Sequence, residues 1–240
     1  MLIEKYFVLL QINMAILKKY ITCYEPLNNG LKDMGFRPNG KYRFLREYNQ
    51  CIQELDFGHA NYGPVKYFGF TICVGYPEVQ KLGKELEAFS VGIIGTNIGY
   101  VTPKKSYKDW RIDASSPDVE ETIQKAAKEM LEDIECYALP FMNRLSSIKV
   151  LISEIEKGNH LVTMESDYQL PILYYLNGEK DLALSYLKNE LKRKESVSQR
   201  NYSDFPFADE ITEKPSSSVD RFLKAYQDFA ERFIEKIKAH

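Results

Sequence analysis

Hydrophobic residues recur along the chain with two different periods. From about residue 42 to residue 93, apolar positions alternate with polar or small ones, which is typical of β-strands. On both sides of this stretch they recur at helical spacing, which is typical of amphipathic helices. The pattern therefore predicts an α+β protein with a mainly antiparallel sheet of about four strands between helical segments.

Four strands are predicted, and they cover Tyr42–Leu45, Cys51–Phe57, Phe68–Tyr76 and a stretch that begins at Phe89–Ile93. Asn49-Gln50 is interpreted as a tight turn, and Gly58–Pro64 is predicted to be a loop. In the third strand, large apolar residues on one face alternate with Gly69, Thr71 and Cys73 on the other. Such small side chains allow close approach, so we expect a helix to pack against that second face.

Helical regions are predicted before and after these strands. The first runs from about Ile3 to Met34, with a break predicted at Asn28–Gly30. Ser116-Pro117 supplies a cap and a favourable first residue for a helix after the sheet. Leu139-Pro140 then begins a further helix, which Gly158 ends. We expect the N-terminal helix and the two helices after Ser116 to pack on the sheet.

The last third of the chain reads as a helical extension. We predict a core domain over residues 1–160 and an extension over residues 161–240 that packs on it. The extension contains two short helices around Asn177-Gly178, an irregular segment from Ser196 to Ser218, and a final helix. The apolar stripe of that helix consists of Val219, Phe222, Tyr226, Phe229, Phe233 and Ile237. A stripe this apolar is expected to dock on another surface.

Composition and charge exclude several kinds of protein. The chain has 240 residues and a formal net charge of −2, so no overall charge attracts it to nucleic acid or anionic lipid. The apolar run Tyr6–Leu17 is too short to span a bilayer. The cysteines Cys23, Cys51, Cys73 and Cys136 contain no C-x-x-C pair, and we expect reduced thiols in a cytoplasmic protein. The three histidines have no metal-ligand spacing, so neither a metal nor a cofactor is predicted.

The order of four segments resembles the bacterial domain-of-unknown-function family 4304. These segments are "LKDMGFRPNGKYRFLR", "FGFTICVGYPEV", "IGYVTPKKSYKDW" and "ALPFMNRLSSIKVLI". The resemblance covers about residues 17–158. Cys73 stands where the family pattern has Asn, and Arg111 stands where it has a second Trp. The family carries no assigned catalysis, so the resemblance implies a fold and no particular chemistry.

Charged residues are segregated along the chain. Basic side chains outnumber acidic ones around the predicted hairpin at residues 37–57, and acidic side chains dominate the helix after Ser116. The two regions could simply be solvated faces that attract each other. The hairpin could also meet an acidic partner protein. The candidate interaction surface consists of Arg43, Arg46, Tyr48 and Trp110.

No catalytic motif stands out in the chain. Asp56, His59 and Tyr62 come nearest to an acid–base set, although these residue types are common in turns for conformational reasons. We therefore predict a non-enzymatic protein-interaction module of the immunity or accessory type. The alternatives are a hydrolase or nucleotide-handling enzyme with a dispersed site, and an RNA-associated module that uses the basic hairpin.

Overall fold

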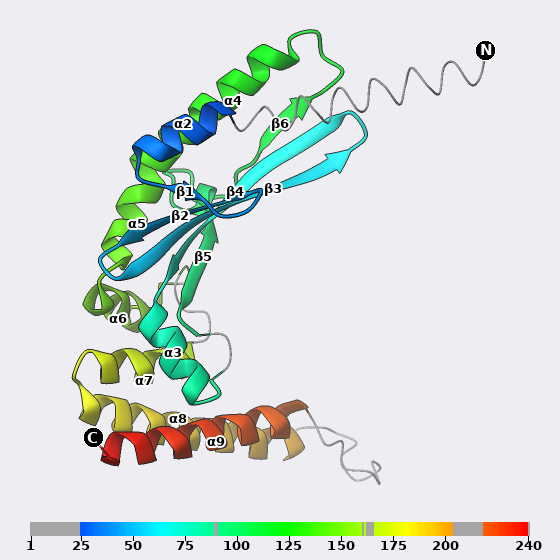
Figure 1. Cartoon of the computed structure of the whole chain (residues 1–240). Coiled ribbons are helices and arrows are strands. Elements are labelled where there is room, and N and C mark those ends of the chain that lie inside the picture. The colour runs from blue at the N-terminus through cyan, green and yellow to red at the C-terminus, as the bar shows by residue number, and fades with distance from the viewer. Residues whose placement is uncertain (1–24, 89–90, 160, 162–165, 204–217, 240) are drawn as a thin grey trace. The chain divides into compact units, whose positions relative to one another are not determined.

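The computed structural model confirms the α+β class and the mainly antiparallel sheet (Figure 1). It describes residues 25–88, 91–159, 161, 166–203 and 218–239. The beginning of the first predicted helix, residues 89–90 of the fourth predicted strand and most of the predicted irregular segment lie outside these ranges. The chain forms two units, unit 1 from residues 1–74 and 95–146, and unit 2 from residues 75–94 and 147–240. This boundary at Ser146-Ser147 differs from the predicted one at residue 160.

The described sheet has six strands rather than about four. They are β1 (Arg37–Pro38), β2 (Arg43–Tyr48), β3 (Cys51–Tyr62), β4 (Val65–Gly75), β5 (Ile93–Asn97) and β6 (Trp110–Asp113). Their order is β1-β2-β3-β4-β5, and β6 pairs antiparallel with the start of β4. The predicted turn at Asn49-Gln50 is confirmed, since Tyr48 pairs directly with Cys51 and both turn residues have positive φ.

Two strand predictions were wrong for the same reason. Residues 58–62 continue β3, so the predicted loop is reduced to a turn at Gly63-Pro64. The four residues of β6 were not recognised as a strand. Residues 58–62 carry few large apolar side chains, and the alternation in Trp110–Asp113 is only four residues long. Both are held in extended form by hydrogen bonds to β4, a partner that local sequence does not reveal.

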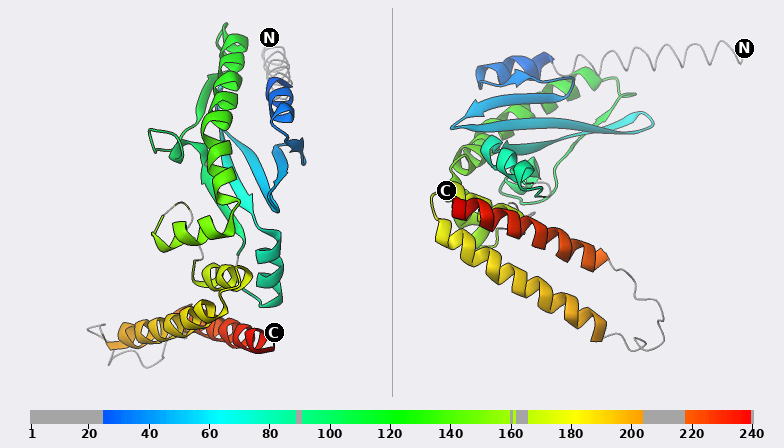
Figure 2. Two further views of the ribbon diagram at one scale, coloured as in Figure 1. Left: turned by 90° about the vertical axis from the view of Figure 1, so that its left-hand side faces the viewer. Right: turned by 60° about the horizontal axis from the view of Figure 1, so that its bottom comes forward.

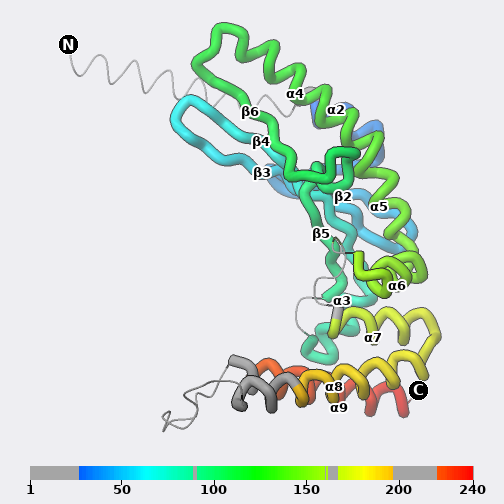
Figure 3. The backbone as a smooth tube through the Cα atoms, turned by 180° about the vertical axis from the view of Figure 1, so that it is seen from behind, coloured from blue at the N-terminus to red at the C-terminus, as the bar shows by residue number. Residues whose placement is uncertain are grey.

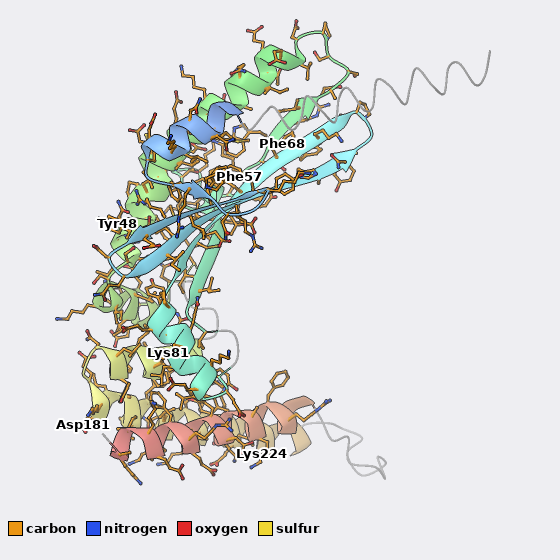
Figure 4. All side chains as sticks on the ribbon, viewed as in Figure 1. Tyr48, Phe57, Phe68, Lys81, Asp181 and Lys224 are labelled. Carbon is orange, nitrogen blue, oxygen red and sulfur yellow. The ribbon has the colours of Figure 1, made fainter. Side chains whose placement is uncertain are left out.

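The described helices of unit 1 cover one face of the sheet (Figure 2). They are α2 (Glu25–Asp33), α4 (Val119–Asp133), the π-helical turn η2 (Ile134–Ala138) and α5 (Leu139–Leu145). Phe57 and Phe68, labelled in Figure 4, are buried on this face. Apolar residues of α2, α4, β4 and β6 together enclose a cavity of only about 20 Å³, so the core is closely packed.

Three helix boundaries differ from the prediction. The helix α2 runs without a break through Asn28–Gly30. Gly30 faces α4, where a Cβ would come within 2.7 Å of the Leu131 side chain, so glycine permits close packing of the two helices. The helix α4 starts at Val119, after Ser116 Oγ has accepted a hydrogen bond from the Asp118 amide. Leu139 continues that helix through η2 rather than beginning a separate one. The helix ends instead at Leu145, and the next helix starts after Ser146-Ser147.

Unit 2 consists mainly of helices, most of which come from the last part of the chain. They are α3 (Pro77–Glu85), α6 (Ile148–Glu156), α7 (Ser166–Leu176), α8 (Lys180–Ser203) and α9 (Ser218–Ala239). The helices α8 and α9 lie side by side (Figure 3). Gly158 follows the end of α6 with positive φ, as predicted. The helix α3 was not predicted, because its few apolar residues lie in a short segment between two strands.

The predicted docking of the last helix is confirmed for most of its stripe. Tyr226, Phe229, Phe233 and Ile237 are buried, whereas Phe222 is 71% exposed. On the polar side, Arg232 contacts Glu87 and Lys236 contacts Glu85, both at 2.9 Å. These contacts join α9 to the end of α3. None of the helices that the structure describes is both long and apolar enough to pass through a membrane.

Candidate binding groove on the open face of the sheet

The face of the sheet opposite the unit 1 helices is called here the open face. Along β4, every second residue from Phe68 onward is buried, and the residues between are only partly buried. Glu54 and Asp56 of β3 lie on the open face, and Arg43 of β2 is paired with Asp56 in the register. The predicted helix over the small side chains of β4 is not observed among the described residues of unit 1. The segment that approaches Gly69 is instead the loop before β6.

A groove of about 750 Å³ lies on the open face. It is lined by residues of β3 and β4, by Asn97 at the end of β5 and by the loop before β6. The lining residues are Asp56, Gly58, His59, Ala60, Tyr62, Tyr67, Gly69, Phe70, Thr71, Asn97, Tyr107 and Asp109. Its volume is in the range of ligand-binding clefts, so the groove is the candidate functional site.

Small side chains form the floor of the groove. Gly58, Ala60, Gly69 and Thr71 come from two adjacent strands, and a Cβ at Gly58 would meet nothing within 4 Å. A Cβ at Gly69 would lie 3.5 Å from the carbonyl oxygen of Lys108 and 3.8 Å from the hydroxyl oxygen of Tyr107. The loop therefore places two hydrogen-bond acceptors directly above the floor.

The loop wall is held in place by a dense set of hydrogen bonds. Asn97 Oδ1 accepts from the amides of Gly99 and Lys108, both at 2.9 Å, and Asn97 Nδ2 donates to the Lys108 carbonyl at 3.1 Å. The Lys108 ammonium forms an ion pair with the mostly buried Asp133 at the end of α4. Because both the backbone and the side chain of Lys108 are fixed, the wall is formed before any ligand arrives.

Tyrosines and carboxylates surround the opening. Tyr62 and Tyr107 are 70% and 63% exposed, and the ring of Tyr62 meets the ring of Tyr67 edge to face at 5.7 Å. Asp56 and Asp109 are the acidic lining residues. Arg43 Nε lies 3.5 Å from Asp56 and 3.8 Å from Glu54, so part of the negative charge on this face is already compensated.

The four residues of the predicted interaction surface lie in different environments. Arg43 is exposed on the open face, whereas the side chain of Arg46 points to the helix side and is partly buried. Tyr48 lies beneath Arg46, with its ring centre 5.1 Å from the guanidinium carbon. Trp110 is 6% exposed and donates to Glu129 of α4 at 3.1 Å. These residues therefore do not form one exposed patch, and Trp110 belongs to the core.

Arg46 belongs to a buried polar network. It donates to Gln53 Oε1, to Asn143 Oδ1 and to the carbonyl oxygen of Met34. Gln53, which is completely buried, donates in turn to Asn143 and Ser146. Burial lowers the pKa of the Arg46 guanidinium from its usual value. The network joins β2 and β3 to α5 and the end of α2.

The structure separates the residues of the predicted acid–base set. Asp56 and Tyr62 face the groove, but the imidazole of His59 packs against aromatic rings. Its centre lies 5.4 Å from that of Tyr42 and 6.3 Å from that of Phe68. Although His59 borders the groove, its ring is therefore engaged on aromatic side chains rather than paired with Asp56.

Burial suppresses the reactivity of the thiol nearest the groove. Cys73 lies on the open face of β4, close to Gly95 of β5. Burial raises the pKa of the Cys73 thiol to about 12, and the carboxylates of Glu54 and Asp56 add to this increase. Burial also raises the pKa of Cys51. Since the thiolate is the nucleophilic form, neither thiol is activated in the folded protein.

We expect iodoacetamide at about pH 8 to alkylate Cys73 at least about 100-fold more slowly in the native protein than in urea. The raised pKa keeps the thiol protonated until the pH approaches 12 in the folded chain. Exposed Cys136 serves as the internal control and should react quickly in both states. Peptide mapping by mass spectrometry measures each site. Native labelling of Cys73 as fast as that of Cys136 would contradict the expectation.

Sequence reasoning missed part of the site. Comparisons of the chain with protein-family models, with curated proteins and with solved structures found no match. Among the described residues, no group of three or more His, Cys, Asp or Glu side chains could hold a metal ion. Tyr107 and Asp109 were not predicted as site residues. Their position over β4 depends on the path of the loop before β6, which local sequence does not show.

Proposed function

We propose that the chain is a non-enzymatic protein-interaction module of the immunity or accessory type, and that it binds its partner through the groove on the open face. The observation that carries this proposal is a broad groove with a preformed wall and exposed tyrosines at its opening. Tyrosine is enriched at protein interfaces because its large ring is buried at little entropic cost and its hydroxyl can still find a partner.

The chemistry around the groove favours binding over catalysis. The one histidine that borders it packs on aromatic rings, and the pKa of the neighbouring Cys73 thiol is raised rather than lowered. A general base would need an imidazole that is free to accept a proton from the substrate, and a nucleophilic cysteine would need a thiol whose pKa is lowered. An enzyme with a dispersed site remains the alternative.

Filling the groove is expected to abolish partner binding. Ala60→Trp places an indole on the floor at an exposed position of β3, where folding should tolerate it. Ala225→Trp is the matched control, because Ala225 is equally exposed but lies on α9 of unit 2. Proteins captured from the native host by the wild-type chain are identified, purified and titrated against the wild type and both variants.

We expect a stoichiometric partner that binds the wild type and Ala225→Trp alike and binds Ala60→Trp at least about tenfold more weakly, a loss of about 1.4 kcal/mol. Two results would contradict the proposal. One is a partner whose affinity does not change in Ala60→Trp. The other is turnover of a small molecule that the groove-filling substitution abolishes.

A further inference from the structure

We propose that the groove receives an arginine or lysine side chain from a basic segment of the partner protein. The cationic head would lie between the carboxylates of Asp56 and Asp109, over the floor at Gly69 and against the tyrosine rings. This inference rests on the proposed function, because it names the chemistry of the partner that the groove selects.

The lining of the groove has an unbalanced charge. It contains two aspartates and neither lysine nor arginine. Lys108, the basic residue of the loop wall, is turned away to Asp133 by its ion pair. Within the described part of the chain, exposed Asp109 forms no ion pair. The basic residue nearest to it in sequence on its C-terminal side is Arg111, which is not among the lining residues. A cation from outside therefore finds a carboxylate without an ion-pair partner, while Arg111, which pairs with Tyr67 in the register, lies beside the lining on the same face.

Asp56 is partly compensated by Arg43. The separation of 3.5 Å and the 56% exposure of the Arg43 side chain describe a loose surface pair rather than a buried one. Such pairs contribute little stability, so Arg43 can be displaced or can share Asp56 with a second cation. Glu54, at 3.8 Å from Arg43, provides Arg43 with another partner when this happens.

The floor adds hydrogen-bond acceptors to the charge. The Lys108 carbonyl and the Tyr107 hydroxyl both lie within 4 Å of the position that a Cβ of Gly69 would occupy. A guanidinium has five N–H donors and no acceptor, so it matches a site made of carboxylate, carbonyl and hydroxyl oxygens. An anionic ligand would be repelled by the carboxylates of Asp56 and Asp109, and of these groups only the tyrosine hydroxyl could donate to it.

The tyrosines complete the recognition of a cation. Tyr62, Tyr67 and Tyr107 all line the groove, and the first and last are largely exposed. An aromatic face attracts a guanidinium or ammonium by about 0.5–1 kcal/mol at exposed sites. Their rings also supply apolar surface for the methylene stem of the incoming side chain. Because the volume exceeds one side chain, neighbouring residues of the segment also fit.

The probe that tests this inference is a short fluorescein-labelled peptide in which arginine alternates with serine. Its matched partner has glutamate in place of arginine, and both are titrated against the full chain at low ionic strength by fluorescence anisotropy. The test variant is Asp56→Asn/Asp109→Asn. The control variant is Glu231→Gln/Glu235→Gln, which changes net charge equally at exposed positions of α9. Trp110 fluorescence verifies that each variant is folded.

We expect the arginine peptide to bind at least about tenfold more tightly than the glutamate peptide, and the test variant to lose about tenfold in affinity while the control variant does not. Equal binding of both peptides, no binding of the arginine peptide, or equal losses in both variants would overturn the inference. So would preferential binding of a single-stranded oligonucleotide. A partner lost in Ala60→Trp but unaffected by Asp56→Asn/Asp109→Asn would overturn only the basic-segment inference and leave the proposed function standing.

Discussion

Replacing Gly99 with alanine is expected to destabilise unit 1 by at least about 2 kcal/mol, because the new methyl group has no space. Its Cβ would lie 2.1 Å from the carbonyl oxygen of Ser106 and 2.6 Å from the amide nitrogen of Lys108. Backbone atoms cannot move aside as a flexible side chain can. Relief of the overlap requires the loop to shift, which breaks the hydrogen bonds that the Gly99 and Lys108 amides donate to Asn97 Oδ1 and that hold the groove wall.

The measurement is chemical denaturation followed by the fluorescence of Trp110, the only tryptophan in the chain, which is buried in unit 1. The matched control is Gly58→Ala, since a Cβ at Gly58 meets nothing within 4 Å and its backbone needs no positive φ. We expect the control to stay within about 0.5 kcal/mol of wild type, as surface substitutions usually do. Equal stabilities of the two variants would show that the loop does not pack on Gly99.

The second large effect is expected at Gln53, where alanine should cost about 3 kcal/mol in the free energy of unfolding. The Gln53 side chain is completely buried and accepts from Arg46 at 2.5 and 3.0 Å. It also donates to Ser146 Oγ at 3.0 Å. Alanine leaves a cavity and removes an acceptor from a guanidinium that burial already disfavours.

A double-mutant cycle separates the network from simple loss of volume. Arg46→Met removes the charge, and Gln53→Leu removes its acceptor with little change of size. The summed losses of the two single variants predict a certain stability for the double variant. We expect the double variant to exceed that stability by at least about 1 kcal/mol, because the second substitution no longer leaves Arg46 or Gln53 without its hydrogen-bond partner. Additive effects in urea denaturation would mean that Arg46 and Gln53 contribute independently.

Together these two sites explain how unit 1 supports the candidate groove. The network of Arg46 and Gln53 attaches the helix-covered face of β2 and β3 to α5. On the other side of the sheet, Asn97 and Gly99 hold the loop that carries Tyr107 and Asp109. The groove is therefore built on a sheet whose opposite face is held by the polar network, which would limit the ordering that the proposed partner has to impose.

Local periodicity was sufficient for the class of the fold and for many of its elements. Alternation along Phe68–Tyr76 placed the large side chains on one face because successive side chains of a strand point in opposite directions. The predicted turn at Asn49-Gln50 was also confirmed, and the register that follows from it pairs Arg43 with Asp56, a relation that only the structure showed. The stripe of the last helix predicted its burial, apart from exposed Phe222 at its beginning.

The sequence by itself determined which residues share a strand face or a helix stripe, because those relations depend on neighbours a few positions apart. Only the tertiary structure decided which face would be covered by helices and which would be left to the loop before β6. That outcome depends on contacts between distant residues, such as Asn97 with Lys108 and Lys108 with Asp133. Trp110 became a core residue and Asp109 a groove residue for this reason, although the two are adjacent in the chain.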